Sequence, residues 1–408
     1  MADRTRSAAR TLQLAEEMAD DLSAIRRRLH RRPEIGLRLP VTQQLIVDEL
    51  AGTYDELHLG AALDSVVAVI RGGAPGASDG PVVLLRGDMD ALPVTEAVES
   101  SYTSEVSGAM HACGHDLHVA GLIGAARILH QRREHLAGDV VLMFQPGEEG
   151  PGGAIPMLDE GLLDVAGRPV DAAYALHVFS AEYPRGQWFS LPGAVMAAAD
   201  EVAITVRGRG GHGSAPHTAQ DPVPVACEIV LALQTAVTRG FSVFDPVVVT
   251  VGCIQGGTKD NIIPDDATLG VTVRTLSPAN REAAAAMVER VARGVAAAHG
   301  LGVDVVWADG YAPTINHRAD YDLGREVVAD LFGADRYVDR DYPEMGSEDF
   351  SFVLERVPGA YFMLGACMAQ DPAAAPDNHS PRAAFDDSVL PDAAAWLAEM
   401  ALRRCERG

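Results

Sequence analysis

The chain has 408 residues, a length that suits two domains of ordinary size better than one. Its formal net charge of −24 disfavours nucleic acid as a partner, because such a surface repels phosphate backbones. The five cysteines, Cys113, Cys227, Cys253, Cys367 and Cys405, are odd in number and form no Cys-x-x-Cys pair, so we expect neither a disulfide framework nor a structural zinc knuckle.

The first part of the chain alternates helical and strand-like segments. Apolar residues recur at helical spacing in three segments, 12–29, 41–50 and 116–129. Nearly continuous apolar runs, typical of buried strands, lie at 65–70, 82–85, 139–144 and 172–176. Strands that are apolar on both faces favour a sheet that helices cover on both sides. We therefore predict an α/β domain with a mostly parallel central sheet.

The pattern changes near Pro192. Residues 201–206 alternate as a half-buried strand does, and Asp221-Pro222 has the residues that begin a helix. The elements that follow are strands at 247–254 and 267–275, an Ala-rich helix at 278–299 and a strand at 303–307. This β-α-β-β-α-β order is typical of a ferredoxin-like unit. We predict an α/β domain formed by 1–193 and 309–408, interrupted by an inserted α+β domain at 194–308.

No continuous apolar run reaches the roughly 18–20 residues that span a bilayer, so we expect no membrane segment. The first residues mix Arg, Asp and Glu, without the apolar core and small-residue cleavage site of a signal peptide. We therefore expect a cytoplasmic protein.

Residues that commonly bind metals follow three of the predicted strands. Asp88 and Asp90 come after the second strand, Glu148 and Glu149 after the third, and His177 ends the fourth. Ligands of open α/β sheets bind outside the carboxyl ends of the strands. We therefore expect these side chains to share one edge of the sheet.

The segment Met110–Asp116 adds Cys113 and His115 just before a predicted helix, whose N-terminus favours the metal-binding thiolate. Thiol, imidazole and carboxylate together suit zinc, manganese or cobalt better than magnesium or calcium. Adjacent glutamates cannot easily bind one ion at the same angle. One of Glu148 and Glu149 can therefore bind a metal while the other acts as a general base for water.

Each of these residues alone has an ordinary structural explanation. A single buried His or Cys is usually a core residue, a Glu-Glu pair is usually a solvated turn, and Asp-x-Asp often caps a turn or helix. Their joint placement on one edge favours a metal site.

A different alternative comes from the segment 208–213, which fits the Gly-x-Gly-x-x-Gly pattern of dinucleotide-binding folds. That fold requires a helix to open at the glycines. Here Ser214-Ala215-Pro216-His217 intervenes before the next helix. We expect a flexible loop that presents His212 and His217.

A series of short motifs runs along nearly the whole chain: His30–Glu34, Gly87–Pro93, Met110–Asp116, Phe144–Gly150, Gly210–Gly213, Asn261–Asp265, Gly346–Phe350 and Asn378–Pro381. In this order and spacing the chain resembles the M20 metallopeptidase and aminoacylase family. It looks most like the branch of hippurate hydrolases, N-acyl amino acid amidohydrolases and plant auxin–amino acid conjugate hydrolases. The resemblance implies a di-metal catalytic domain with an inserted ferredoxin-like lid and dimerisation domain.

The resemblance also assigns roles to particular residues. It implies metal ligands at Cys113, His115, Glu149, His177 and His379, with Cys113 bridging the two ions. Glu148 falls at the position of the general base. His212 falls where the family has a lid His that reaches a neighbouring subunit's site and stabilises the oxyanion. Asn261 and Arg274 fall near lid positions that hold substrate.

Two departures from the family pattern concern Arg32 and Asp88. Arg32 stands where this branch often has His, and we interpret it as a surface change. Asp88 stands where other branches have a metal-binding His, and we expect it to support the site without binding metal. Asp90 would orient a ligand. Asp116 would either do the same or cap the helix.

The implied activity is cleavage of the amide bond of small N-acyl amino acids. The resemblance implies two divalent ions, with manganese or zinc favoured and cobalt open, and a homodimer formed through the lid. Arg274 would hold the carboxylate of the amino acid, which Arg suits by geometry. A dipeptidase or carboxypeptidase with the same site is the alternative within hydrolases. A non-catalytic metal-binding scaffold is the alternative outside them, and the Glu148-Glu149 pair argues against it.

Overall fold

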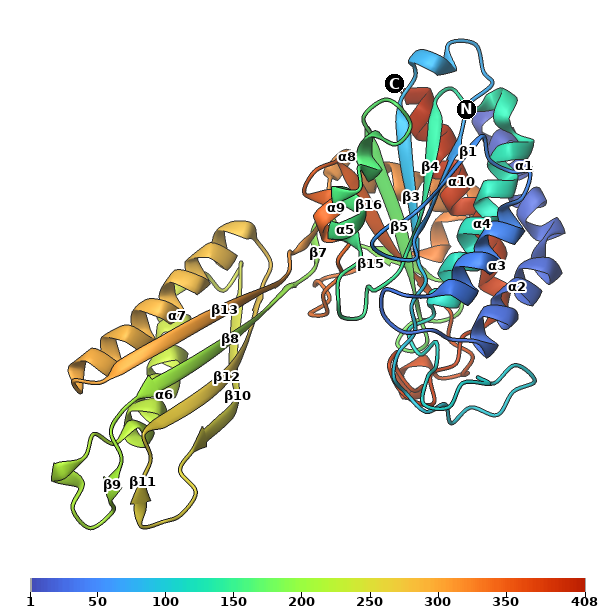
Figure 1. Ribbon diagram of the computed structural model, residues 1–408. Helices are drawn as coiled ribbons and strands as arrows, with labels where there is room; N and C mark the ends of the chain where they lie inside the picture. The colour runs from blue at the N-terminus through green and yellow to red at the C-terminus, as the bar shows by residue number, and fades with distance from the viewer. Residues whose placement is uncertain (1, 408) are drawn as a thin grey trace. The chain divides into compact units, whose positions relative to one another are not determined.

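The computed structural model describes residues 2–407, which form two compact units (Figure 1). Unit 1 takes in the chain up to Gly193, then Ile315–Tyr342, and the chain from Phe352 onward. Unit 2 comprises Ala194–Thr314 and a short return at Pro343–Ser351. The predicted insertion at 194–308 lacks this return. Ala197 N–H donates to the carbonyls of Glu344 and Gly346, a local pairing that no sequence pattern announces.

Unit 1 is built on an eight-stranded sheet of order β1-β2-β4-β3-β5-β16-β6-β15. Its strands are β1 (Glu56–Leu59), β2 (Val66–Ile70), β3 (Val82–Asp88), β4 (Asp139–Gln145), β5 (Ala172–Phe179), β6 (Trp188–Ser190), β15 (Tyr337–Asp339) and β16 (Gly359–Gly365). Strands β4, β3, β5 and β16 are parallel, whereas β1, β2 and the β16–β6 pair are antiparallel to their neighbours. The α/β fold is confirmed, with a mixed sheet whose parallel strands lie at its centre.

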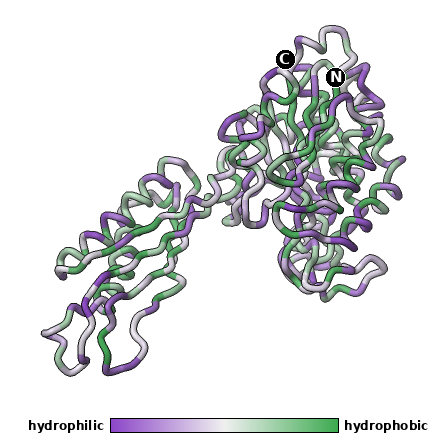
Figure 2. Tube along the Cα trace, viewed as in Figure 1, coloured by the Kyte–Doolittle hydropathy of each residue, from purple (hydrophilic) through white to green (hydrophobic). Residues whose placement is uncertain are grey.

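The helices of unit 1 are α1 (Ala2–Glu17), α2 (Ala19–Arg31), α3 (Pro40–Leu50), α4 (His115–Gln131), α5 (Ala154–Asp159), α8 (Arg318–Phe332), α9 (Ser351–Leu354, which begins in the return) and α10 (Leu390–Arg407). Most of α4 is buried, because it packs against β3, α2 and α10. The sheet strands beneath these helices are largely hydrophobic (Figure 2). The single helix expected at 12–29 is two helices, which part at Met18.

Unit 2 contains a four-stranded antiparallel sheet of order β10-β12-β8-β13. Its elements are β8 (Ala198–Arg207), α6 (Pro222–Gly240), β10 (Val247–Gly256), β12 (Asp266–Thr275), α7 (Pro278–Ala298) and β13 (Gly302–Tyr311). Alternate residues of β8, such as Ile204, are buried in one apolar core with Ile229 and Leu233 of α6. This is the predicted β-α-β-β-α-β order. Two small ribbons pair β9 (Gly211–His212) with β11 (Ile262–Ile263), and β7 (Gly193–Met196) with β14 (Thr314–Asn316).

Among the described residues, one helix, α6, is long and apolar enough to cross a membrane by length and composition. The sequence did not predict such a helix, because polar residues such as Glu228 interrupt its apolar run. A single such helix is weak evidence for a membrane protein. Val225 and Leu233 of α6 are buried against the sheet of unit 2.

Gly114 precedes α4 with a φ of 83°, a left-handed conformation, and a Cβ at this position would overlap the Val178 side chain. We expect Gly114→Ala to lower the free energy of unfolding by about 2–5 kcal/mol, from backbone strain plus overpacking. Gly52→Ala is a matched control, because Gly52 has a φ of 80° but open space around it. It should cost only about 1–2 kcal/mol. Equal losses in urea denaturation would show that the contact with Val178 is unimportant.

Candidate metal centre

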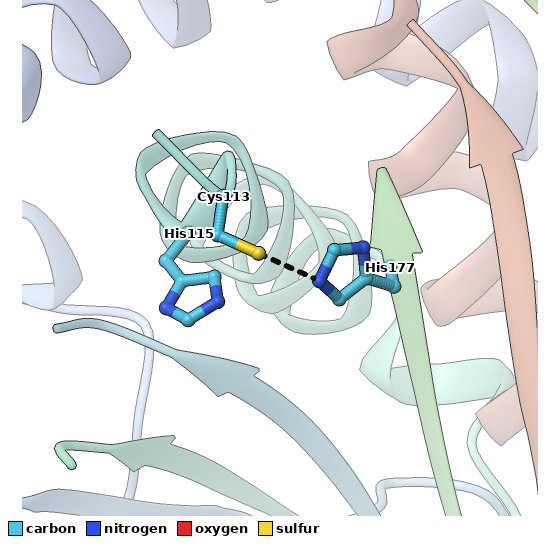
Figure 3. A group of neighbouring side chains, drawn as sticks. All are labelled: Cys113, His115 and His177. Carbon is cyan, nitrogen blue, oxygen red and sulfur yellow. Dashed lines mark hydrogen bonds between the residues drawn. The ribbon is translucent and has the colours of Figure 1, made fainter. Parts of the chain in front are cut away.

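The carboxyl ends of β3, β4 and β5 lie at one edge of the sheet of unit 1, because the three strands are parallel neighbours. The paired residues of β3 and β5 end at Arg86 and Ala175. Beyond this point the two strands no longer pair with each other, and His177 follows on β5. The loop before α4 brings Cys113 to the same edge, and the first residue of α4, His115, lies beside it (Figure 3).

Two groups of potential ligands meet here and share one residue. The ligand atoms of Cys113, His115 and His177 lie within 4.8 Å of one another, and so do those of Cys113, Glu149 and His379. Cys113 Sγ lies 3.3 Å from His177 Nε2 (Figure 3). Glu149 Oε1 lies 3.2 Å from His379 Nε2. The structure therefore brings together all five residues that the resemblance implied, with Cys113 common to both groups.

Hydrogen bonds to carbonyl groups fix the orientation of two of the imidazoles. His115 Nδ1–H donates to the carbonyl of Asp90 at 2.9 Å, and His177 Nδ1–H donates to the carbonyl of Val178 at 2.8 Å. Both rings therefore direct Nε2 toward the cluster. His115 Nε2 is buried there without a hydrogen-bond partner. A thiol, imidazoles and a carboxylate around an unpartnered buried nitrogen fit a metal such as zinc, manganese or cobalt.

Asp90 organises the adjacent glutamates. Its carboxylate accepts the backbone N–H of Glu148 at 3.0 Å and that of Glu149 at 3.1 Å. Its own backbone carbonyl accepts from His115. Asp90 thus holds groups from two other segments and belongs to neither ligand group.

Asp88 is fully buried, and both of its oxygens are engaged. Arg86 contacts one oxygen, and His118 Nδ1 lies 2.5 Å from the other. Burial alone would raise the pKa of Asp88, but Arg86, His115 and His118 hold it well below its usual value. This buried carboxylate is therefore held in its ionised form beside His115, and its support of the site without binding metal stays a prediction.

Asp116 faces away from the cluster, toward α2. Its Oδ2 lies 2.8 Å from Arg26 Nε and 2.7 Å from His30 Nδ1, and all three side chains are buried. Asp116 therefore fastens the first turn of α4 to α2. Its effect on the metal centre is through the position of α4.

The electrostatic field of the site favours a cation. Although burial lowers it, the pKa of His115 rises to about 10, because Asp88, Asp90 and Glu149 surround the ring. Burial and the carboxylates of Glu149 and Glu148 raise the pKa of Cys113 well above its usual value. The expectation that the helix N-terminus favours a thiolate is therefore wrong for the metal-free site. A bound cation would oppose these carboxylates and favour the thiolate.

Two features of the site were not singled out from the sequence. His379 has a φ of 69°, which is uncommon for a residue other than glycine and is typical of strained functional positions. The neighbouring Asn378 donates to the Val178 carbonyl at 3.0 Å and accepts from Ser180 N–H at 2.9 Å. Asn378 thus ties the His379 loop to the end of β5. Its place beside His379 in the motif was the available signal.

Three predicted residues, His212, Asn261 and Arg274, lie in unit 2. Glu148 and the five potential ligands lie in unit 1. His212 on β9 pairs with Ile262, and Gly213 N–H donates to the Asn261 carbonyl, so His212 and Asn261 lie close together. Arg274 lies near the far end of β12, about 25 Å along the strand from the end next to this ribbon. The structure therefore does not bring Arg274 beside Asn261 within one chain. The glycines at 208–213 open no helix, as expected.

Comparison with known proteins agrees with this arrangement. The model of the peptidase family M20/M25/M40 matches residues 84–403. The chain belongs to this family. The resemblance seen in the motifs is thereby confirmed, and the protein is a metal-dependent hydrolase.

Individual relatives are similar over almost the whole chain. IAA-amino acid hydrolase ILR1-like 2 of Arabidopsis thaliana is 39% identical, covering 95% of this chain and 86% of the relative. Thermostable carboxypeptidase 2 of Saccharolobus solfataricus is 37% identical, covering 92% and 93%. The crystal structure of the Bacillus subtilis YXEP protein, described as a dinuclear metal-binding peptidase of the M20 family, has a TM-score of 0.82 at 31% identity, covering 96% and 99%. A non-catalytic scaffold does not fit relatives that are hydrolases.

Metal binding should release protons, because His115 Nε2 and the Cys113 thiol both carry a proton in the metal-free site at neutral pH. The apparent affinity should therefore rise with pH, by up to about tenfold per pH unit for each proton released. Calorimetric titration of Zn²⁺ or Mn²⁺ in buffers of different ionisation enthalpy would count the protons. An affinity that is the same at about pH 6 and pH 8 would contradict this electrostatic account.

Proposed function

We propose that this protein hydrolyses the amide bond of N-acyl amino acids, releasing a carboxylic acid and a free amino acid. The observation that carries the proposal is the pair of ligand groups that share Cys113, with Glu148 beside Glu149 at their edge. One group would hold the first ion through Cys113, His115 and His177. The other would hold the second through Cys113, Glu149 and His379. We propose manganese or zinc as the metal, with cobalt as a substitute.

Glu148 and Asp90 would have different roles in the reaction. Bound ions would supply electrophilic assistance to the carbonyl and lower the pKa of the attacking water. Glu148 would take the proton of that water and return it to the leaving amine. Asp90 supports this role because it holds the backbone of Glu148 and Glu149 together, so that the base and the ligand keep a fixed spacing.

We further propose that the protein acts in the cytoplasm as a homodimer formed through unit 2. His212 of a second copy would then stabilise the oxyanion, and Asn261 and Arg274 would hold substrate from different copies. The separation of Arg274 from Asn261 within one chain supports this arrangement. So does the surface of unit 2, where β10 is an edge strand and Leu231, Val243 and Phe244 are 70%, 82% and 95% exposed.

A carboxypeptidase or dipeptidase is the second candidate. It is favoured by the 37% identity to thermostable carboxypeptidase 2. The metal centre and Glu148 would serve either substrate, since both contain an amide bond next to an amino acid carboxylate. The two candidates differ in the group on the acyl side.

A panel of substrates separates the two candidates. We expect metal-dependent release of amino acid from N-acetyl or N-benzoyl amino acids, with a higher kcat/KM than for dipeptides that carry the same C-terminal residue. The protein should be dialysed free of metal and assayed with and without Mn²⁺, Zn²⁺ or Co²⁺. Faster cleavage of the dipeptides would favour the second candidate.

Glu148→Gln tests the proposed base. The variant should bind metal as the wild type does, because Glu148 is not among the five proposed ligands. Its kcat should fall by about 10²–10⁴-fold, because Gln cannot take a proton from water. Metal content by atomic emission spectroscopy is the control. A variant with full metal content and near-normal kcat would remove Glu148 from the mechanism.

Leu231→Arg together with Phe244→Arg tests the dimer. The variant should sediment as a monomer and lose most of its activity, because His212 would no longer reach a second copy's site. Its metal affinity should stay unchanged, because all five proposed ligands lie in unit 1. Full activity in a protein shown to be monomeric would contradict the role of His212.

A further inference from the structure

His118 is a buried histidine on α4 whose two ring nitrogens are both engaged. It lies one turn after His115, and its side chain is about 1% exposed. The Val178 backbone N–H donates to Nε2 at 2.9 Å, so Nε2 must be an acceptor. Nδ1 therefore carries the proton and donates to Asp88 at 2.5 Å.

The ring occupies the place where β3 and β5 stop pairing. The last paired residues are Arg86 and Ala175, and His118 bridges Asp88 at the end of β3 to Val178 on β5. Gly87 makes this approach possible, because a Cβ there would lie only 3.0 Å from the His118 carbonyl oxygen. His118 thus supplies the link between the two strands that their own backbones no longer make.

The same ring contacts two of the proposed metal ligands. Its centroid lies 4.8 Å from that of His177 and 5.4 Å from that of His115, on which it stacks. The bonds continue through the backbone of one residue, since the Val178 N–H donates to His118 Nε2 and the Val178 carbonyl accepts from His177 Nδ1. A chain of contacts therefore runs from Arg86 through Asp88, His118 and Val178 to His177.

An alternative is that His118 itself binds metal, since Asp88, His115 and His118 offer atoms within 4.8 Å of one another. Their hydrogen bonds argue against it. Nε2 of His118 already accepts from Val178, and both oxygens of Asp88 are engaged by Arg86 and His118. A metal at this point would have to break these bonds.

We propose that His118 is a positioning residue for the ion held by Cys113, His115 and His177, and has no comparable role for the ion held by Cys113, Glu149 and His379. This inference rests on the two-metal centre of the proposed function. It extends that proposal by giving one ion a dedicated support that the other lacks. Loss of such a support commonly weakens metal affinity by about 10- to 100-fold.

Co²⁺ titration followed by visible absorption tests the proposal. The titration step of each ion would be assigned with His177→Ala and His379→Ala. In His118→Phe, which keeps a ring but loses both hydrogen bonds, affinity at the His115–His177 site should fall about 10- to 100-fold, while the other site stays unchanged. His118→Gln should restore much of the loss, because its amide both donates and accepts. His130→Phe, farther along α4, is the matched control and should leave both sites unchanged.

The outcomes are distinguishable. Equal weakening of both sites, or no weakening in a folded His118→Phe protein, would overturn the role of His118. A His118→Gln protein that binds metal no better than His118→Phe would also contradict it. Binding of fewer than two ions by the wild-type protein would count against the proposed function. A selective loss at the His115–His177 site would still support the role of His118 in that case.

Discussion

The carboxylate of Asp90 accepts the backbone N–H groups of both Glu148 and Glu149, and this pair of bonds joins the end of β3 to the turn after β4. The Asp90 carbonyl also receives the Nδ1–H of His115. One buried residue thus sets the positions of three groups from two other segments. Hydrogen bonds in such an interior are stronger than in water, so these bonds hold Glu148, Glu149 and His115 in fixed relative positions.

The same interior concentrates carboxylates that would otherwise repel one another. Arg86 and His118 compensate Asp88, whereas Glu149 relies on His115 and His379. Burying charge is costly unless it is paired, and here an arginine and three histidines pair with the two carboxylates. The carboxylates raise the pKa of His115 against the effect of burial, whereas burial and the carboxylates together raise the pKa of Cys113. Divalent ions that bind here would therefore displace protons.

Much of the fold followed from sequence patterns, because buried strands and amphipathic helices have strong periodicities. The strand expected at 267–275 is Asp266–Thr275, and the helix expected at 116–129 is His115–Gln131. Patterns of this kind did not reveal the break at Met18, which has no Gly or Pro, or the short β6 and β15 strands. The return at Pro343–Ser351 depends on backbone bonds between distant residues.

The sequence also indicated the proposed ligands of the candidate site, but not the residues that support them. Motifs that are local in sequence contained four of the five proposed ligands, and the end of a predicted strand indicated the fifth, His177. The residues that support the ligands could not be predicted in this way. His118 and Asn378 bind the backbone N–H and carbonyl of Val178, and these contacts depend on the position of β5 in the fold. The direction of the Cys113 pKa was also missed. A helix N-terminus is a local feature, whereas the opposing carboxylates arrive from other strands.

Strand β16 pairs with β5 although some 180 residues separate them in the chain. During synthesis β5 therefore leaves the ribosome with one edge unpaired. Most of unit 2 is made before β16, the partner strand of β5, appears. Unpaired edges of this kind promote association between chains. His379 is made later still, so a nascent chain cannot close both ligand groups. The order of the strands thus leaves completion of the metal centre until the last part of the chain has been made.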